Sequence, residues 1–309
     1  METVAHLGEH QLLQRLKSYC SAAVGDDAAR LPVIPPGWET VITTDMLVDG
    51  VHFSDRTTSP SDVGWRAAAA NLSDLAAMGA KPLGAVVALA VPPHTDVAWI
   101  EGVYQGLQAG LQTYGATLDG GDTVRAPGRS LTVTVLGEVL PERVWRRSAA
   151  RPGQALWVSG PHGRSRAGLA LLQGEIQVPE PLATELRLAH QRPRPRLDVV
   201  PAVPPGPWAA IDSSDGLAIA LLQLCQSSGA GARLDWEALP LPTIAVTGEQ
   251  ARQWGLYGGE DFELVMALPP AIAQDLCQQF PESRIVGTVV VEPGIPGLEP
   301  RQAFGHFVP

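Results

Sequence analysis

The sequence predicts an α/β (α+β) protein of two domains. The chain has 309 residues, and one domain usually takes roughly 100 to 200 residues. Strand-like and helix-like stretches alternate through the first half, and this alternation restarts after a basic segment that ends at Arg151-Pro152-Gly153. We therefore place one domain at residues 1–142 and a second domain at residues 143–309.

The first half opens with a helix predicted over about residues 5–20, where leucines recur at near-helical spacing. A mixture of β-branched and apolar residues from Thr40 to Leu47 predicts a buried strand. A helix is predicted from Asp62 to about Met78, with Ser61 as its cap. The other elements predicted in this half are a strand at Leu83–Val91, a helix at Val97–Tyr114 and an alternating strand at Ser130–Val139.

The helix predicted from Asp62 to Met78 is largely apolar on both faces of a helical wheel. Such a helix is packed on both sides. Asp74 lies within it and faces a large desolvation cost unless another group compensates its charge. We therefore take Asp74 as the first candidate for a functional residue.

The second half is predicted to contain the same kinds of element. They are a strand at Ala155–Val158, a helix from about Arg166, a strand at Trp208–Ile211, a helix from about Gly216, and strands at Phe262–Leu268 and Ile285–Val291. Arginine and proline alternate from Arg192 to Arg196, which we interpret as an extended connection on the surface.

Composition and charge exclude several classes of protein. Asp and Glu outnumber Lys and Arg by 32 to 22, for a formal charge of −10, which opposes binding to nucleic acid phosphates. The longest apolar stretch, Leu83–Pro93, is shorter than the roughly 20 residues that cross a bilayer, so we expect no membrane partner. The start shows no secretory signal and the three cysteines lie far apart. We therefore expect a cytoplasmic protein with reduced thiols.

Acidic residues recur beside glycines or at the ends of predicted strands. Five motifs show this, in addition to Asp74: Gly25-Asp26-Asp27, Thr43-Thr44-Asp45, Gly120-Gly121-Asp122-Thr123, Asp212-Ser213-Ser214-Asp215-Gly216 and Gly258-Gly259-Glu260-Asp261. Each motif alone is explained by ordinary turn or cap chemistry. Together they suggest carboxylates that converge in one cleft, where they would repel one another unless cations lay among them. Oxygen ligands of this kind select Mg²⁺ or Ca²⁺, and Mg²⁺ is usually shared with substrate phosphates.

Other signals for catalysis are weaker. His6 and His10 lack a third ligand nearby, and a solvated helix face explains them. His52 follows the acidic strand, where a turn or core histidine and a substrate contact are equally good interpretations. The sequence contains neither a phosphate-binding loop lysine nor a Gly-x-Ser-x-Gly nucleophile turn.

The acidic motifs, taken in order along the chain, resemble those of one known family. They occur here as Gly25-Asp26-Asp27-Ala28, Thr43-Thr44-Asp45 with Gly50-x-His52-Phe53, the run Asn71–Ala80, Gly120-Gly121-Asp122-Thr123, Ile211–Gly216 and Gly258–Glu263. This combination resembles the thiamine-monophosphate kinases, in the superfamily of aminoimidazole-ribonucleotide synthetase. The resemblance extends from about Gly25 to Phe307.

The resemblance implies a fold and an activity. Two α/β domains with mixed sheets are expected in each chain, which forms a homodimer through the first, metal- and nucleotide-binding domain, with ATP in a cleft between domains or subunits. The implied reaction moves the γ-phosphoryl group of ATP, with several Mg²⁺ ions, to thiamine monophosphate and yields thiamine diphosphate and ADP. No strong protein base is needed, because a phosphate monoester with a second pKa of about 6 is largely ionised near neutral pH.

The resemblance also implies a role for each matching residue. Metal binding falls to Asp27, Thr43, Thr44, Asp45, Asp74, Asp122, Asp212 and Asp215; ATP binding to Gly121, Asp122, Arg147 and Ser214; and thiamine monophosphate binding to His52, Glu260 and Phe304. We expect Asp45, Asp122 and Arg147 to act in catalysis. A generic basic linker is the competing interpretation of Arg147. This chain departs from the family pattern at Ala303-Phe304-Gly305-His306-Phe307 and at the turn Gly160–Arg164.

Two alternative functions stay open. One is another phosphoryl-transfer enzyme of the superfamily. Selenophosphate synthetase would need a reactive residue in a glycine-rich loop, which Cys20 fits poorly, and the hydrogenase-maturation relative would need a carboxyl-terminal cysteine where this chain has Phe307-Val308-Pro309. The other is a regulatory protein that uses the same carboxylates to bind a metal or nucleotide without turnover.

Overall fold

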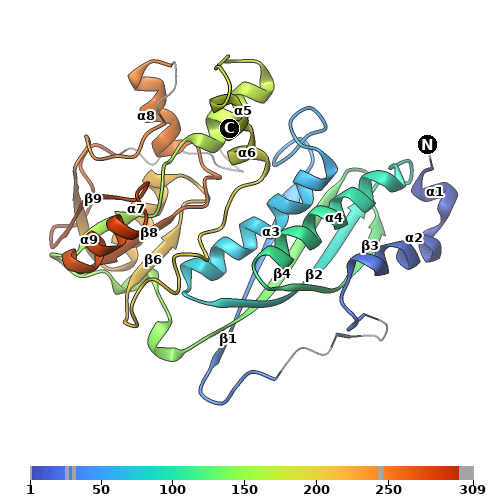
Figure 1. The fold of residues 1–309 in the computed structure, drawn as a ribbon, viewed down its shortest axis with the longest axis horizontal. Coiled ribbons are helices and arrows are strands. Elements are labelled where there is room, and N and C mark those ends of the chain that lie inside the picture. Colours follow the sequence, from blue (N-terminus) through green and yellow to red (C-terminus); the bar gives the residue numbers. More distant parts are fainter. Residues whose placement is uncertain (1, 25–27, 30–32, 243–245, 299–309) are drawn as a thin grey trace. The chain divides into compact units, whose positions relative to one another are not determined.

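The computed structural model describes residues 2–24, 28–29, 33–242 and 246–298. They divide into two compact units (Figure 1). Unit 1 consists of Met1–Leu75 and Lys81–Val139, and unit 2 consists of Ala76–Ala80 and Leu140–Pro309. The domain boundary that we place between residues 142 and 143 stays a prediction.

Unit 1 contains one four-stranded sheet and its helices. The strands are β1 (Glu39–Val48), β2 (Lys81–Val91), β3 (Thr117–Arg125) and β4 (Ser130–Val139). The helices are α1 (Val4–Leu7), α2 (Glu9–Leu16), the 3₁₀ helix η1 (Lys17–Tyr19), α3 (Pro60–Ala77) and α4 (Val97–Thr113). In the sheet the order is β1-β4-β2-β3, with β2 and β3 parallel and the other two pairs antiparallel.

Helices α3 and α4 cover one face of this sheet (Figure 1). Pro60 opens α3, where a proline costs no hydrogen bond, and the amide of Asp62 donates to Ser59 Oγ at 3.2 Å. Ser59 is therefore the cap of α3, and our assignment of Ser61 was wrong by two residues. A run of alanines from Ala67 to Ala70 is buried, as the apolar faces of this helix predict.

The other face of the unit 1 sheet stays open within the chain. Ile42 and Met46 of β1 are 67% and 53% exposed, and Val86 of β2 is 38% exposed. Successive side chains of a strand point to opposite faces. The sheet therefore carries a buried face against the helices and an exposed, partly apolar face.

Unit 2 contains a five-stranded antiparallel sheet. Its strands are β5 (Ala155–Val158), β6 (Ala209–Asp212), β7 (Gly231–Leu234), β8 (Leu264–Leu268) and β9 (Arg284–Val290), in the order β6-β8-β5-β9-β7. Its helices are η2 (Pro141–Arg143), η3 (Arg147–Ala149), α5 (Arg164–Gln173), α6 (Leu182–Gln191), α7 (Leu217–Ser227), α8 (Gly248–Tyr257) and α9 (Pro270–Gln279).

The unit 2 sheet is buried on both faces. Along β8, Val265 packs in the core cluster that contains residues of α7, whereas Leu264 and Met266 pack in the cluster that contains residues of α9. All five residues of β8 are buried. A continuous apolar run of this kind is what a strand covered on both sides requires. In β5, β6 and β8, which are buried throughout, functional side chains can therefore only lie at strand ends.

The structure confirms the α+β class and most predicted elements, but it corrects three expectations. The strand predicted at Thr40–Leu47 is an edge strand with an exposed face and is not buried, and two acidic motifs lie within strands. Gly120-Gly121-Asp122-Thr123 is not a turn, because β3 continues through it. A β-carbon on Gly121 would lie 2.1 Å from the carbonyl oxygen of Val87, so this close approach of two strands requires a glycine. Thr43-Thr44-Asp45 also lies within β1 and not at its end. In the described residues, no helix is both long enough and apolar enough to cross a bilayer.

We predict that Gly64→Ala destabilises unit 1. A β-carbon at Gly64 would lie 1.9 Å from the carbonyl oxygen of Val103, so α3 and α4 must move apart, at a cost of about 1 to 3 kcal/mol. Gly248→Ala is the control, because its β-carbon meets no atom within 4 Å. Urea unfolding followed by circular dichroism measures both variants. A Gly64→Ala protein as stable as the wild type would contradict the prediction.

Candidate active site

The first group of candidate residues lies on β1 and α3 in unit 1. Thr43 and Asp45 point to the same face of β1, because they are two residues apart. The hydroxyl of Thr43 donates a hydrogen bond to Oδ2 of Asp74 on α3. Asp74 is half-buried, and this hydroxyl compensates part of the cost of placing a carboxylate in an apolar helix. The structure therefore brings together three of the predicted metal ligands.

Thr44 points to the opposite face of β1. Its hydroxyl lies 3.0 Å from the hydroxyl of Thr134 and 3.1 Å from the carbonyl oxygen of Val133, both on β4. Its side chain is exposed on the open face of the sheet. Thr44 is therefore separated from Thr43 and Asp45 by the sheet itself.

Asp122 lies on β3, the outer strand opposite β1. Asp122 pairs with Ala88 of β2. Ala88 pairs with Thr132 of β4, and Thr132 pairs with Met46 of β1. Asp122 therefore shares the open face with Met46, three strand spacings or about 14 Å across the sheet. Within one chain, the structure does not bring Asp122 together with Asp45 and Asp74.

His52 lies in the loop that follows β1. Its Nδ1 atom accepts a hydrogen bond of 3.0 Å from the backbone amide of Val48. In the neutral ring the hydrogen therefore lies on Nε2, which is a donor. A donor in this position suits an acceptor such as a phosphate oxygen.

Arg129 binds the loop that carries His52 at residues on both sides of that histidine. Its guanidinium donates to Asp49 at 2.8 Å and to both carboxylate oxygens of Asp55 at 2.9 Å, and it lies 4.7 Å from the centre of the Trp99 ring. Burial opposes its charge, but the hydrogen bonds that it donates to Asp55 and Asp49 outweigh burial and raise the pKa of Arg129. Our sequence analysis missed this residue, because no spacing along the chain links Arg129 to the loop.

In unit 2, the second acidic group follows β6. Asp212 is the last residue of that strand and is 4% exposed. The hydroxyl of Ser214 lies 3.3 Å from Asp212 Oδ1, and Asp215 is exposed in the turn before α7. This turn is at a strand end, as predicted, and it holds two carboxylates and two hydroxyls within four residues.

Glu260 belongs to the loop between α8 and β8. Its amide donates to the carbonyl oxygen of Ser214 at 2.7 Å, so this loop lies against the turn after β6. Glu260 and Phe262 have φ angles of 58° and 52°, in the left-handed region that residues other than glycine rarely adopt. The structure therefore brings Glu260 next to Ser214, although 46 positions separate them in the numbering.

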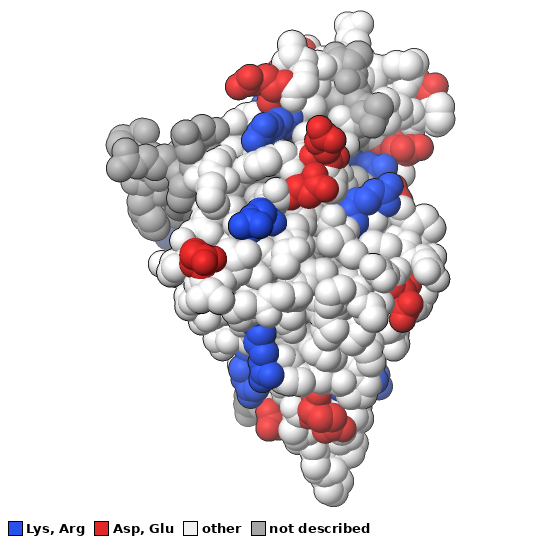
Figure 2. Space-filling view, turned by 90° about the vertical axis from the view of Figure 1, so that its left-hand side faces the viewer, with Lys and Arg blue, Asp and Glu red and all other residues white. Residues whose placement is uncertain are grey.

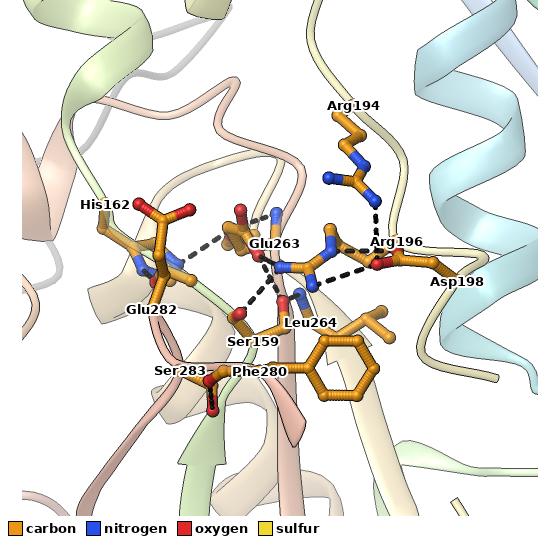
Figure 3. Close-up of polar contacts among 12 residues, drawn as sticks. Ser159, His162, Arg194, Arg196, Asp198, Glu263, Leu264, Phe280, Glu282 and Ser283 are labelled. Atoms are coloured by element: carbon orange, nitrogen blue, oxygen red, sulfur yellow. Dashed lines mark hydrogen bonds and ion pairs between the residues drawn. The ribbon is translucent and has the colours of Figure 1, made fainter. Parts of the chain in front are cut away.

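A largely buried ion pair lies directly after this loop (Figure 3). Arg196 donates to Glu263 at 2.5 Å, and their side chains are 8% and 14% exposed. Burial raises the pKa of Glu263, while Arg196 and the Ser159 hydroxyl oppose that rise. Our interpretation of Arg192–Arg196 as a surface connection is therefore wrong for Arg196.

Two further groups hold the turn between β5 and α5. Asp261 accepts the amides of Gly163 and Ser165 at 2.6 and 2.9 Å, and burial raises the pKa of this carboxyl to about 7. His162 is fully buried, with Nε2 3.0 Å from the Ser213 hydroxyl. Burial lowers the pKa of His162 to about 4.

Three predicted residues receive little or no description from the structure. Asp27 and Phe304 lie outside the described residues. Arg147 lies in η3, where its side chain donates to Gln223 at 3.2 Å. In the described part of the chain, no three His, Cys, Asp or Glu side chains gather closely enough to hold a metal by themselves. On the face drawn in Figure 2, acidic and basic side chains are interspersed and form no continuous basic track.

Comparison with known proteins gives a consistent result. Residues 25–139 match the AIR synthase related protein N-terminal domain, and residues 151–296 match the corresponding C-terminal domain. The chain is 48% identical to a thiamine-monophosphate kinase of Synechococcus elongatus, over 94% of this chain and 91% of that protein. It is 42% identical to the Escherichia coli K12 enzyme of the same name, over 80% and 76%.

Solved structures give the same result. The thiamine-monophosphate kinase of Stenotrophomonas maltophilia superposes with a TM-score of 0.80 at 32% identity, over 92% of this chain and 94% of that chain. AaThiL, solved in complex with AMPPCP and TMP, superposes with a TM-score of 0.75 at 32% identity, over 94% and 93%. The E. coli hydrogenase maturation protein HypE, at 19% identity and a TM-score of 0.77 over 93% and 92%, shows a shared fold alone.

We predict that His162 makes the stability of unit 2 depend on pH. With a pKa of about 4 in the folded state and about 6.5 when unfolded, the unfolded chain binds the extra proton first. Stability therefore falls as the pH drops from 6.5 to 4, by about 3 kcal/mol. Asp261, whose pKa is raised, contributes a slope of the opposite sign in the same range.

The measurement is therefore a difference between two proteins. Urea unfolding of the wild type and of His162→Asn is followed at pH 7, 5.5 and 4. The contribution of Asp261 cancels, and we expect the gap in unfolding free energy to narrow by about 3 kcal/mol towards pH 4. A gap that stays constant would mean that the fold does not hold His162 neutral.

Proposed function

We infer that this chain, which belongs to the family of AIR synthase related proteins, is one of the thiamine-monophosphate kinases. It transfers the γ-phosphoryl group of ATP to thiamine monophosphate and releases ADP and thiamine diphosphate. The observation that carries this conclusion is the extent of the likeness to enzymes of that name, which runs through both halves of the chain.

The reaction requires positioning more than acid–base chemistry. The acceptor is a phosphate oxygen, and its second pKa of about 6 leaves it ionised near neutral pH. What opposes transfer is the repulsion between two groups of negative charge, so catalysis consists of aligning them and neutralising their charge. The described site agrees with this requirement, because it offers hydroxyls, carboxylates and a histidine donor.

We propose that several Mg²⁺ ions bind to the acidic groups. Thr43, Asp45 and Asp74 supply only oxygen atoms, which is the donor set of a hard cation. Mg²⁺ usually takes one or two carboxylates together with substrate phosphates, so a site without three clustered carboxylates fits it. When bound, the metal would neutralise phosphate charge and align the reacting oxygens. The remaining proposed ligands are Asp27, Thr44, Asp122, Asp212 and Asp215.

The roles of the other residues are also proposals. Gly121, Asp122, Arg147 and Ser214 bind ATP, and Arg147 stabilises charge on the group in transfer. His52, Glu260 and Phe304 bind thiamine monophosphate. The tautomer of His52 supports its role, since the Val48 amide occupies Nδ1 and the neutral ring therefore carries its hydrogen on Nε2.

We further propose a homodimer that completes the site. The unit 1 sheet has an open face with Ile42 and Met46, and its two outer strands carry Asp45 and Asp122. A second copy related by a two-fold axis would cover that face and place its β3 beside β1. The partner's Asp122 would then meet Thr44 on the same face, which one chain alone does not achieve.

We propose a cytoplasmic location for this enzyme. The three cysteines are free, as is usual in reducing compartments. Burial raises the pKa of Cys225 to about 11, so this thiol stays protonated and unreactive. ATP as co-substrate is consistent with the same compartment.

Phosphorus NMR of the purified protein with Mg-ATP and thiamine monophosphate tests the reaction. We expect ADP and thiamine diphosphate to appear, and Asp45→Asn to lower the rate by about a hundredfold or more with the fold intact. Asp275→Asn, an exposed carboxylate on α9, is the matched control and should leave the rate unchanged. Equal turnover of unrelated phosphates would contradict the substrate assignment, and an unchanged rate would remove Asp45 from the mechanism.

Mixing two inactive variants tests the dimer. β1 is an outer strand, so the partner's Asp122 beside Thr44 and this chain's Asp45 on the other face would lie at the same edge of the sheet. If the two carboxylates serve one site across that edge, Asp45→Asn and Asp122→Asn proteins that exchange subunits form heterodimers with one intact site. The mixture should regain about a quarter of the wild-type activity. Each variant alone, mixed with itself, is the control. No recovery, with exchange verified by light scattering and mass tagging, would place both carboxylates of a site in one chain.

A further inference from the structure

The ion pair between Arg196 and Glu263 lies beside the site without belonging to the residues that are expected to touch a substrate. It lines a pocket of about 470 Å³ in unit 2. Arg196 also donates to the carbonyl oxygen of Ser159 at 2.6 Å and to Asp198 at 3.1 Å, and its guanidinium lies 5.6 Å from the Phe280 ring centre. Figure 3 shows the Arg196 and Glu263 side chains pointing toward each other.

Glu263 joins three segments that are distant in the sequence. Its carboxylate accepts from Arg196 and from the hydroxyl of Ser159, at the end of β5. Its backbone exchanges hydrogen bonds with Ser213: the amide of Ser213 donates to the Glu263 carbonyl at 2.9 Å, and the amide of Glu263 donates to the Ser213 hydroxyl at 3.1 Å. Glu263 is therefore an anchor between the ends of β5, β6 and β8.

The backbone at Gly160 lies close to the carboxylate of Glu263. A β-carbon on Gly160 would lie 2.5 Å from Oε1 of Glu263. Only a glycine leaves space for the carboxylate at that position. The packing around Glu263 is therefore specific to a carboxylate that reaches the β5 end.

The loop before this anchor has a backbone that needs support. Glu260 and Phe262 adopt left-handed φ angles, and such residues persist only where the surrounding structure determines their conformation. One end of the loop is held by the bond from the Glu260 amide to Ser214. The other end is held by Glu263 and, through it, by Arg196.

We propose that Arg196 and Glu263 are positioning residues, which hold the loop of residues 258–263 so that Glu260 presents its carboxylate to thiamine monophosphate. This inference rests on the proposed function for the role of Glu260. The carboxylate of Glu263 supports the Glu260–Phe262 backbone. The turn that holds Ser214 and Asp215 is instead held by the bonds between Ser213 and the backbone of Glu263, which do not involve that carboxylate. Loss of the ion pair should therefore affect the thiamine monophosphate side of the site more than the ATP side.

Glu263→Gln tests the proposal, because it keeps the shape of the side chain and removes its charge. We expect the KM for thiamine monophosphate to rise by about tenfold, with a change below about threefold in the KM for ATP. Arg196→Met should likewise raise the KM for thiamine monophosphate much more than the KM for ATP. Arg196→Lys should raise the KM for thiamine monophosphate by less than Arg196→Met does, because an ammonium keeps the charge but not the planar set of donors.

The control is an exposed ion pair at the same pocket. Arg164 and Glu282 lie 2.9 Å apart, with side chains 38% and 64% exposed. Glu282→Gln removes a charge of the same kind without touching the loop, and we expect both KM values to stay at the wild-type level. If Glu282→Gln raised the KM for thiamine monophosphate over that for ATP as much as Glu263→Gln does, the proposal would be overturned.

Hydrogen exchange supplies a readout that does not depend on turnover. In Glu263→Gln, the amide of Glu260 should exchange faster by about tenfold or more, while amides in β8 keep their protection. If the wild type shows no kinase activity, the proposed function is wrong, and the exchange result still decides whether the pair holds the loop. Folded variants with unchanged KM values and unchanged exchange at Glu260 would overturn the positioning role.

Discussion

Carboxylates placed close together repel one another, and in the described part of this protein three carboxylates that point inward are each paired with a donor. Asp74 accepts from the Thr43 hydroxyl, and Glu263 accepts from Arg196. Asp261 accepts two backbone amides at the start of α5. Asp74, one of the carboxylates proposed for Mg²⁺, is therefore held in place by the protein itself, which is the preorganisation that phosphoryl transfer requires.

The two sheets differ in where along their strands functional side chains can lie. In unit 1 one face of the sheet is open, so functional residues can lie in the middle of a strand, and alternation sends Thr44 and Asp45 to opposite faces. In unit 2 the strands β5, β6 and β8 are buried throughout, so their functional polar groups collect at the strand ends. The turn after β6 and the loop before β8 meet there, which explains why Ser214 and Glu260 lie side by side.

The segment from Gly258 to Glu263 serves two purposes within a few residues. Glu260 is proposed to contact the substrate, whereas Asp261 and Glu263 fasten the same segment to α5, β5 and Arg196. One short segment therefore contains both the residue proposed to contact the substrate and the residues that hold it in position. Its left-handed residues are stable because hydrogen bonds on both sides determine their conformation.

Local patterning of the sequence predicted the α+β class and most strands and helices, and the acidic motifs carried the resemblance to a known family, because all of these depend on residues close together in the chain. The sequence could not predict β3 through Gly120-Gly121, where a strand tolerates glycines because its neighbour approaches closely. It also misplaced Arg196, since the arginines of an alternating arginine–proline run are normally exposed. Which side chains face each other across a sheet, and which distant loops share a hydrogen bond, were decided only by tertiary structure, because strand register and loop packing join residues that no local spacing connects.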